Sequence, residues 1–211
     1  MDITINPINM KTLKLCIVCL LLISFYSCSK DDDSSNEKET IQQQVENFVT
    51  PDLIQTLEEL GYNFNDGEDS PNIEGVFLYS TVVLEASNIP NDSPIGSSFF
   101  NLEVDFSELN PEQRQFTLRT TEGTSSQSEA VTNTFYSGNG NSFSAYAKLG
   151  ITVEGGTATI LYAFSGTITE NGISNAQEAL IMLDDNNVSG LIENGQGRLF
   201  RDEDGTAERQ Q

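Results

Sequence analysis

The stretch NGNSFSAYAKLGITVEGGTATILYAFSGTITENG, residues 139–172, decides the fold because it contains three pairs of turn-forming residues at a regular interval. Each pair tolerates the positive φ that a tight hairpin requires. Two similar pairs extend the series, and the five are Glu122-Gly123, Asn139-Gly140, Gly155-Gly156, Asn171-Gly172 and Asn186-Asn187. Their spacings of 17, 16, 16 and 15 residues leave no room for crossover helices. The sequence therefore predicts an antiparallel meander.

Between the turns, apolar and polar residues alternate at the period of two that half-buried strands show. The alternation predicts eight strands, at 75–86, 97–107, 113–121, 125–137, 142–154, 157–170, 173–184 and 188–201. Closure into a barrel is the most economical way for that many strands to remove their edges. The predicted fold is mainly β, an up-and-down meander of about eight strands forming a barrel. An eight-stranded sandwich and a curved sheet packed on helices are the alternatives.

A helical segment and loop, residues 41–72, precede the predicted barrel domain at 73–211. Apolar residues recur at helical spacing from Ile41 to Leu60, and Thr50-Pro51 resembles an N-cap followed by proline at the first helical position. Gly61 is the expected stop. The pattern predicts two short helices, or one that is broken at Thr50. Their apolar faces are expected to pack on the sheet, and a groove for a partner is the alternative.

The first 27 residues have the profile of a secretory signal. Lys11 and Lys14 precede an uncharged run at 15–26, and the small residue Ser27 follows it. A transmembrane helix needs about 20 apolar residues, so this shorter run favours a signal peptide over a permanent anchor. The basic segment that begins at Met10 suggests that translation starts there.

The segment LLISFYSCSKDDDSS resembles a bacterial lipoprotein signal, in which lipid is attached to the cysteine that becomes the first mature residue. The resemblance implies lipidation of Cys28. The residues that follow are charged and lack apolar periodicity, which predicts a flexible acidic tether at 28–40. The residues after Cys28 are similar to the export signal of surface lipoproteins in the Bacteroidetes, and they are Ser29, Lys30, Asp31, Asp32 and Asp33. The resemblance implies an outer-membrane protein that a lipid anchors and that is exposed at the cell surface.

The segment PNIEGVF, Pro71–Phe77, is similar to the first strands of small secreted barrels. Together with the meander, it resembles the lipocalin or calycin group, although this chain has Gly75-Val76-Phe77 where lipocalins usually have Gly-x-Trp. The resemblance implies an eight-stranded barrel whose interior is either filled by side chains or holds one small ligand.

Composition excludes several kinds of chemistry. The net charge of −22 repels phosphate backbones, so nucleic-acid binding is not expected. Histidine is absent from the sequence, and the three cysteines lie at or before Cys28. Ser-His-Asp and Cys-His catalysis and the usual zinc sites are therefore excluded, and neither a cofactor nor a disulfide in the mature chain is expected.

Carboxylates remain as the plausible acid–base groups. Four lie within predicted strands, on what we interpret as the solvated face: Glu103, Asp105, Glu129 and Glu178. Asp184–Asn187 and the segment around Asp202 and Asp204 carry oxygen ligands of the kind that calcium prefers, but neither segment supplies a full EF-hand loop. Acidic turn residues are the commoner explanation, so the sequence predicts no catalytic or metal site.

Two function classes follow. The first is a non-catalytic protein that binds a small apolar or amphipathic ligand inside the barrel. The second is a surface interaction or structural scaffold protein whose barrel is packed. Candidate ligand-binding residues are Tyr162, Phe164, Thr132 and Thr134, on the predicted inward faces of their strands. Carbohydrate stacking on exposed Tyr79, Tyr136 or Tyr146 is a weaker third hypothesis.

Overall fold

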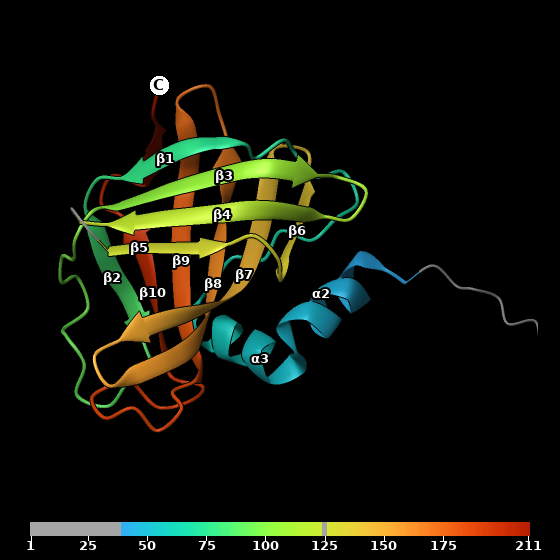
Figure 1. Cartoon of the computed structure of the whole chain (residues 1–211). Helices are drawn as coiled ribbons and strands as arrows, with labels where there is room; N and C mark the ends of the chain where they lie inside the picture. The colour runs from blue at the N-terminus through green and yellow to red at the C-terminus, as the bar shows by residue number, and fades with distance from the viewer. Residues whose placement is uncertain (1–38, 124–125) are drawn as a thin grey trace, which may run out of the picture. The chain divides into compact units, whose positions relative to one another are not determined.

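The computed structural model describes residues 39–123 and 126–211. This part of the chain contains eleven strands and two short helices. These residues form an antiparallel, nearly closed, lipocalin-like barrel with the helices on the N-terminal side (Figure 1). This confirms the predicted fold class. The elements are α2 (Ile41–Val49), α3 (Pro51–Leu60), β1 (Gly75–Tyr79), β2 (Val82–Ser87), β3 (Leu102–Asn110), β4 (Gln115–Glu122), β5 (Ser126–Ala130), β6 (Thr134–Asn139), β7 (Ser142–Val153), β8 (Gly156–Ile168), β9 (Gly172–Asp184), β10 (Gly197–Asp202) and β11 (Thr206–Arg209).

The strands pair in the order β5-β4-β3-β1-β11-β9-β8-β7-β6. Simple up-and-down hairpins link β3 to β5 and β6 to β9, as the meander predicts. The last strand, β11, lies between β1 and β9, and β10 pairs with both β9 and β2. Figure 1 shows β1, β3, β4 and β5 crossing the long strands β7, β8 and β9. Because β11 connects the two sets of strands, it is central to the barrel.

Four predicted strands differ from the structure, two of them because the chain turns corners that the alternation does not reveal. The predicted strand at 75–86 divides into β1 and β2 around Ser80, whose N–H donates to Oδ2 of Asp202 at 2.8 Å. The predicted strand at 125–137 divides into β5 and β6 around Asn133, which has a φ of 58°. The predicted strand at 97–107 begins only at Leu102, and the one at 188–201 begins only at Gly197. The strand β11 lies beyond the last predicted strand.

The barrel closes where β4 approaches β6. Tyr136 N donates to the carbonyl of Arg114 at 3.0 Å. The hydroxyl of Thr134 accepts from Phe116 N at 3.1 Å and donates to Phe116 O at 2.6 Å. A buried side chain therefore replaces part of a backbone ladder along this seam.

Four of the five predicted turn pairs lie at hairpins, whereas Asn186-Asn187 lies in the longer segment at 185–196 that connects β9 to β10. Each of the five pairs contains a residue with positive φ, such as Gly140 at 63° and Asn186 at 47°. The backbone can therefore reverse within two or three residues, and long strands such as β7 and β8 pair along their whole length.

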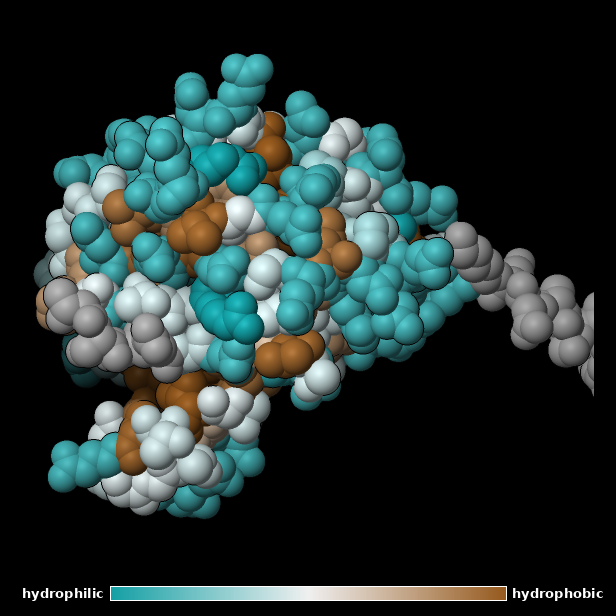
Figure 2. All heavy atoms as spheres, turned by 45° about the horizontal axis from the view of Figure 1, so that its top comes forward, coloured by the Kyte–Doolittle hydropathy of each residue, from teal (hydrophilic) through white to brown (hydrophobic). Residues whose placement is uncertain are grey.

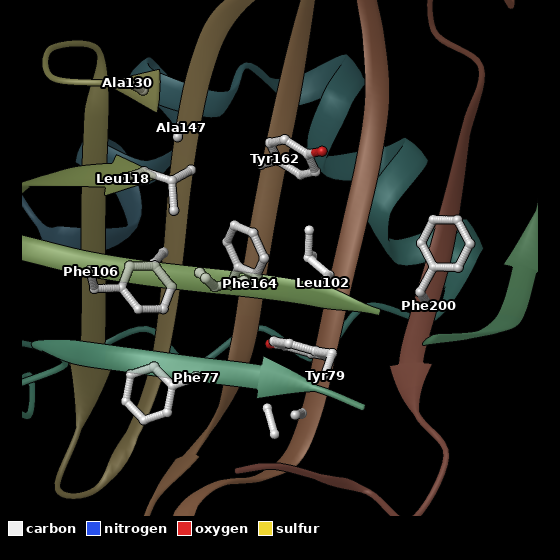
Figure 3. Packing of buried hydrophobic residues seen from close by; sticks show 14 of the residues in the cluster. Phe77, Tyr79, Leu102, Phe106, Leu118, Ala130, Ala147, Tyr162, Phe164 and Phe200 are labelled. Atoms are coloured by element: carbon white, nitrogen blue, oxygen red, sulfur yellow. The ribbon is translucent and has the colours of Figure 1, made fainter. Parts of the chain in front are cut away.

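An aromatic cluster packs inside the barrel (Figure 3). Phe106 of β3 lies at its centre, and its ring centroid is 5.5 Å from those of Phe116 and Phe164. The rings of Phe77 and Phe143 each lie 6.1 Å from it. These rings come from both crossing sets of strands, so the cluster joins the two sets.

The two helices cover the outer face of the long strands, which confirms the predicted packing. Their buried side chains lie in one cluster with outward-facing residues of the sheet, including Tyr146, Leu161 and Ile181. Both faces of β7, β8 and β9 are therefore buried in the middle of these strands, whereas Gly150 and Thr152 near the end of β7 are exposed. Thr40 and Gln43 form a capping box at α2, and α3 begins with Pro51 and ends at Gly61.

No helix within residues 39–123 and 126–211 is both long and apolar enough to cross a bilayer. The predicted signal peptide at 1–27, the lipidation site Cys28 and the export signal at 29–33 lie outside the described residues, as does the tether up to residue 38.

Candidate functional site

The aromatic cluster does not fill the whole barrel. A pocket of about 150 Å³ lies between β3, β8, β9 and β10, next to the segment that connects β2 to β3. Its apolar lining includes Leu102, Tyr162 and Phe200, and Figure 3 shows Leu102 and Tyr162 beside Phe164, with Phe200 farther to one side. The remaining lining residues are Val82, Phe99, Phe100, Glu122, Glu178, Leu180 and Arg198.

Glu178 is the unusual group in this pocket. It is only 4 % exposed, and on the sheet it pairs with Phe164 of β8 on one side and Phe200 of β10 on the other. Its carboxyl group has no hydrogen-bond partner among the described residues. Burial, reinforced by the negative charge of Glu122, raises the pKa of Glu178 to about 8. At pH 7 the Glu178 side chain is therefore mostly protonated.

The interpretation of Glu178 as a solvated charge is wrong. Alternation fails as a guide in β9, because the residues on both of its faces are buried, with Ala179 and Ile181 under the helices and Met182 inside the barrel. A strand that is apolar on both faces buries any charged residue within it. The apolar residues on both faces of β9 are the sequence feature that could have predicted the burial of Glu178.

Tyr162 is the one candidate ligand-binding residue that lines the pocket. Its ring is 7 % exposed and stacks on Phe164 with a centroid distance of 5.5 Å. Burial raises the pKa of Tyr162, and the nearby carboxyl groups of Glu178 and Glu122 raise it further. Phe164 is fully buried behind Tyr162, against Phe106. It supports the pocket without lining it.

Neither threonine candidate reaches the pocket. Thr132 is exposed in the connection between β5 and β6, and Thr134 is held in the seam by its hydrogen bonds to Phe116. The prediction of a single strand at 125–137 put both threonine side chains on the inward face of that strand. The expectation that three tyrosines are exposed is also wrong, since each is at most 2 % exposed: Tyr79, Tyr136 and Tyr146.

Arg198 brings a positive charge to the pocket wall, but Asp92 neutralises it. Its Nε and a terminal nitrogen donate to the two carboxylate oxygens of Asp92 at 2.8 and 2.6 Å. The hydrogen bonds from Arg198 hold the pKa of Asp92 well below its usual range. The guanidinium also lies 5.6 Å from the ring centroid of Phe99. The ionisable groups of the pocket that have no counter-charge are therefore Glu122 and Glu178.

The other strand-borne carboxylates face outward, as predicted. Glu103 and Glu129 are exposed and Asp105 is half-buried, and Arg119 forms ion pairs with Asp105 at 3.7 Å and with Glu129 at 2.6 Å. A broader hollow of about 390 Å³ lies on this outer face. Figure 2 shows a largely hydrophilic surface with separate apolar patches. The outer hollow lacks the buried, unpartnered group that distinguishes the barrel pocket.

The carboxylates in the acidic turns accept hydrogen bonds from nearby backbone N–H groups. Asp184 and Asp185 accept hydrogen bonds from the backbone N–H groups of Asn186 and Asn187, at 2.9 and 3.0 Å. The buried Asp202 accepts from Ser80 N and Asp204 N. Within 39–123 and 126–211, no cluster of three or more potential metal-ligating side chains is present. The carboxylates of these turns therefore have a structural explanation.

Comparisons with known proteins returned no matching family model, no similar curated protein and no similar solved structure. The roles of the pocket residues therefore have to follow from their own burial, contacts and chemistry.

Proposed function

We propose that this protein is a lipid-anchored lipoprotein of the outer membrane, exposed at the cell surface, whose barrel binds a small apolar or amphipathic ligand. The observation that carries the binding role is the pocket around Glu178. Burying a carboxyl group without a counter-charge costs stability, so a fold that needed only a packed core would not favour Glu178. Apolar pockets with a few convergent polar groups and a perturbed pKa are typical of ligand sites.

The size of the pocket limits the ligand. A cavity of about 150 Å³ accommodates a group about as large as benzene, whereas pockets for drug-sized ligands have volumes of roughly 300–1,000 Å³. The pocket therefore holds a small molecule, or one end of a larger one. The exposed Phe100 at its lining offers apolar contact to any part of the ligand that projects outward.

A non-catalytic role suits these residues. Glu178 and Glu122 are two carboxyl groups of the kind that glycosidases use, but such a pair must flank the scissile bond and leave room for water. Glu178 is buried in a pocket of about 150 Å³, which offers little space for a saccharide chain. Because the sequence contains no histidine, the commonest general base is also absent.

The proposed cellular location depends on Cys28 and the residues after it. Each buried methylene of an acyl chain contributes about 0.8 kcal/mol, and two or more chains hold a protein stably on a membrane. The acidic segment after Cys28 resembles the export signal of Bacteroidetes surface lipoproteins. A charged tether of this composition suits a barrel displayed away from the membrane.

Replacing Cys28 by Ala should release the protein from the envelope fraction, because the acyl chains would have no thiol to attach to. Replacing residues 30–33 by Ala should leave the protein lipidated but protected from protease added to whole cells. Fractionation and surface proteolysis measure the two effects, and Cys19→Ala is the matched control that should stay in the envelope. A Cys28→Ala protein that still partitions into detergent with the membranes would refute lipidation.

The binding role is tested by titrating the purified protein with indole and following the chemical shifts of the pocket residues. We expect saturable binding that Leu180→Trp weakens at least tenfold, because the larger side chain occupies the pocket volume. Ile95→Trp adds the same ring at an exposed position and should leave binding unchanged. Absence of saturable shifts for indole and for polar probes of similar size would favour the packed scaffold.

A further inference from the structure

We propose that the barrel pocket binds a small organic ammonium ion, held between the carboxyl group of Glu178 and the aromatic rings of Phe99, Tyr162 and Phe200. This inference rests on the proposed binding function and names the chemical class of its ligand.

The first support is the position of Glu178. Its side chain is 96 % buried by the surrounding strands, lines the pocket and has no hydrogen-bond partner among the described residues. An ammonium group in the pocket would supply the missing donor or counter-charge. Leaving a buried carboxylate without a counter-charge is costly, and a bound cation removes that cost.

The second support is the balance of charge around Glu178. The titratable groups that influence it or line the same pocket are Tyr79 of β1, Glu122 of β4, Tyr162 of β8 and Arg198 of β10. Burial keeps both tyrosines neutral, and Asp92 neutralises Arg198. Two carboxyl groups remain, so once Glu178 has lost its proton the pocket favours a cation and repels the carboxylate of a fatty acid.

The third support is the aromatic wall. Phe99 and Phe200 meet edge to face with centroids 5.1 Å apart, and Tyr162 lines the same pocket. Aromatic faces attract ammonium ions through the ring quadrupole, and several rings together recognise quaternary ammonium groups. The guanidinium of Arg198 over Phe99 shows that a cation is already accepted on one of these rings.

A metal ion fits these residues less well. Calcium takes six to eight oxygen ligands, and magnesium requires an octahedral set. The pocket offers two carboxyl groups, and most of its remaining lining is apolar. An organic cation uses the same two charges and also gains from burying its methyl groups against phenylalanine rings.

Binding of this ligand should release a proton. The pKa of Glu178 is about 8, so its carboxyl O–H is intact at pH 7, and an ammonium ion favours the carboxylate. The proton passes to solvent as the cation binds. By linkage, the affinity should rise about tenfold per pH unit up to pH 8 and level off above it.

Calorimetric titration of the purified full-length protein with choline tests this inference, because its quaternary ammonium keeps its charge at every pH. The matched probes are 3,3-dimethylbutan-1-ol, the neutral isostere, and 3,3-dimethylbutanoate, the anion. At pH 8 we expect choline to bind at least tenfold more tightly than the alcohol, and the anion most weakly. Titrations at pH 7 in two buffers of different ionisation enthalpy should report close to one proton released per choline bound.

Glu178→Gln should weaken choline binding at least tenfold and abolish its pH dependence. Glu103→Gln removes the same charge from the outer face of the barrel and should change the affinity less than twofold. Equal affinities for choline and the alcohol, or choline binding without proton release, would overturn the ammonium inference while leaving a small-ligand site in place. If choline, the alcohol, the anion and indole all fail to bind, the proposed binding function fails as well.

Discussion

Replacing Gly172 by Val should destabilise the barrel by about 3–5 kcal/mol, a large share of the stability of a typical domain. Gly172 begins β9 with a φ of 149°, a conformation that costs a side-chain-bearing residue about 1–3 kcal/mol. A Cβ atom here would also overlap the carbonyl oxygen of Ala207 and lie 2.9 Å from Arg209 N. Both atoms belong to the backbone of β11, so the clash displaces the strand that joins β1 to β9.

Gly140 supplies the matched control. It has a φ of 63° in the hairpin between β6 and β7, but nothing lies within 4 Å of a Cβ built there. Gly140→Ala should therefore cost only about 1 kcal/mol, the conformational penalty alone. Urea unfolding followed by circular dichroism measures both variants. Equal losses for Gly172→Val and Gly140→Ala would contradict the placement of β11 against Gly172.

Replacing Glu178 by Gln should stabilise the protein, and the gain should grow with pH. The pKa of Glu178 is about 8 in the folded protein, whereas a glutamate in an unfolded chain has a pKa of about 4.3. Between these values the unfolded state releases the proton and the folded state keeps it. The free energy of unfolding therefore falls as pH rises from about 4 to about 8, and the loss stays constant above pH 8.

Glutamine does not titrate, so the free energy of unfolding of the variant lacks this pH-dependent decrease. We expect the two proteins to differ little at pH 4, and the variant to be more stable by roughly 5 kcal/mol at pH 9. Other carboxylates titrate alike in both proteins and cancel in the comparison. Urea unfolding at pH 4, 6 and 9 measures the difference, with Glu103→Gln as the control that should show almost none. A difference that does not vary with pH would rule out the raised pKa.

This expected gain connects stability with function. A side chain that weakens the folded state above pH 4, in a pocket it does not help to pack, is typical of a site where activity conflicts with stability. The Phe106 cluster in the same barrel shows the contrasting case, in which the interior is packed. The proposed ligand would offset the cost of Glu178 by supplying the counter-charge that the fold does not.

Much of the architecture could be predicted because its signals are local. The turn pairs act through the φ values of one or two residues, as at Asn139-Gly140. Thr50-Pro51 and Gly61 set the boundaries of α3, and each affects only the adjacent turn of the helix. Such signals keep their meaning wherever the segment lies in the fold. They were sufficient for the helices, the hairpins and the mainly β class.

The sequence by itself determined the meander, the helices that cover it and the lipoprotein hypothesis for the N-terminus. Only the tertiary structure decided that Glu178 is buried, that Thr132 and Thr134 lie away from the pocket, and that β11 lies between β1 and β9. Alternation tells which residues share a face of a strand, but the environment of that face depends on distant parts of the chain. The surroundings of Glu178 come from Glu122, Tyr162 and Phe200, which only folding brings together.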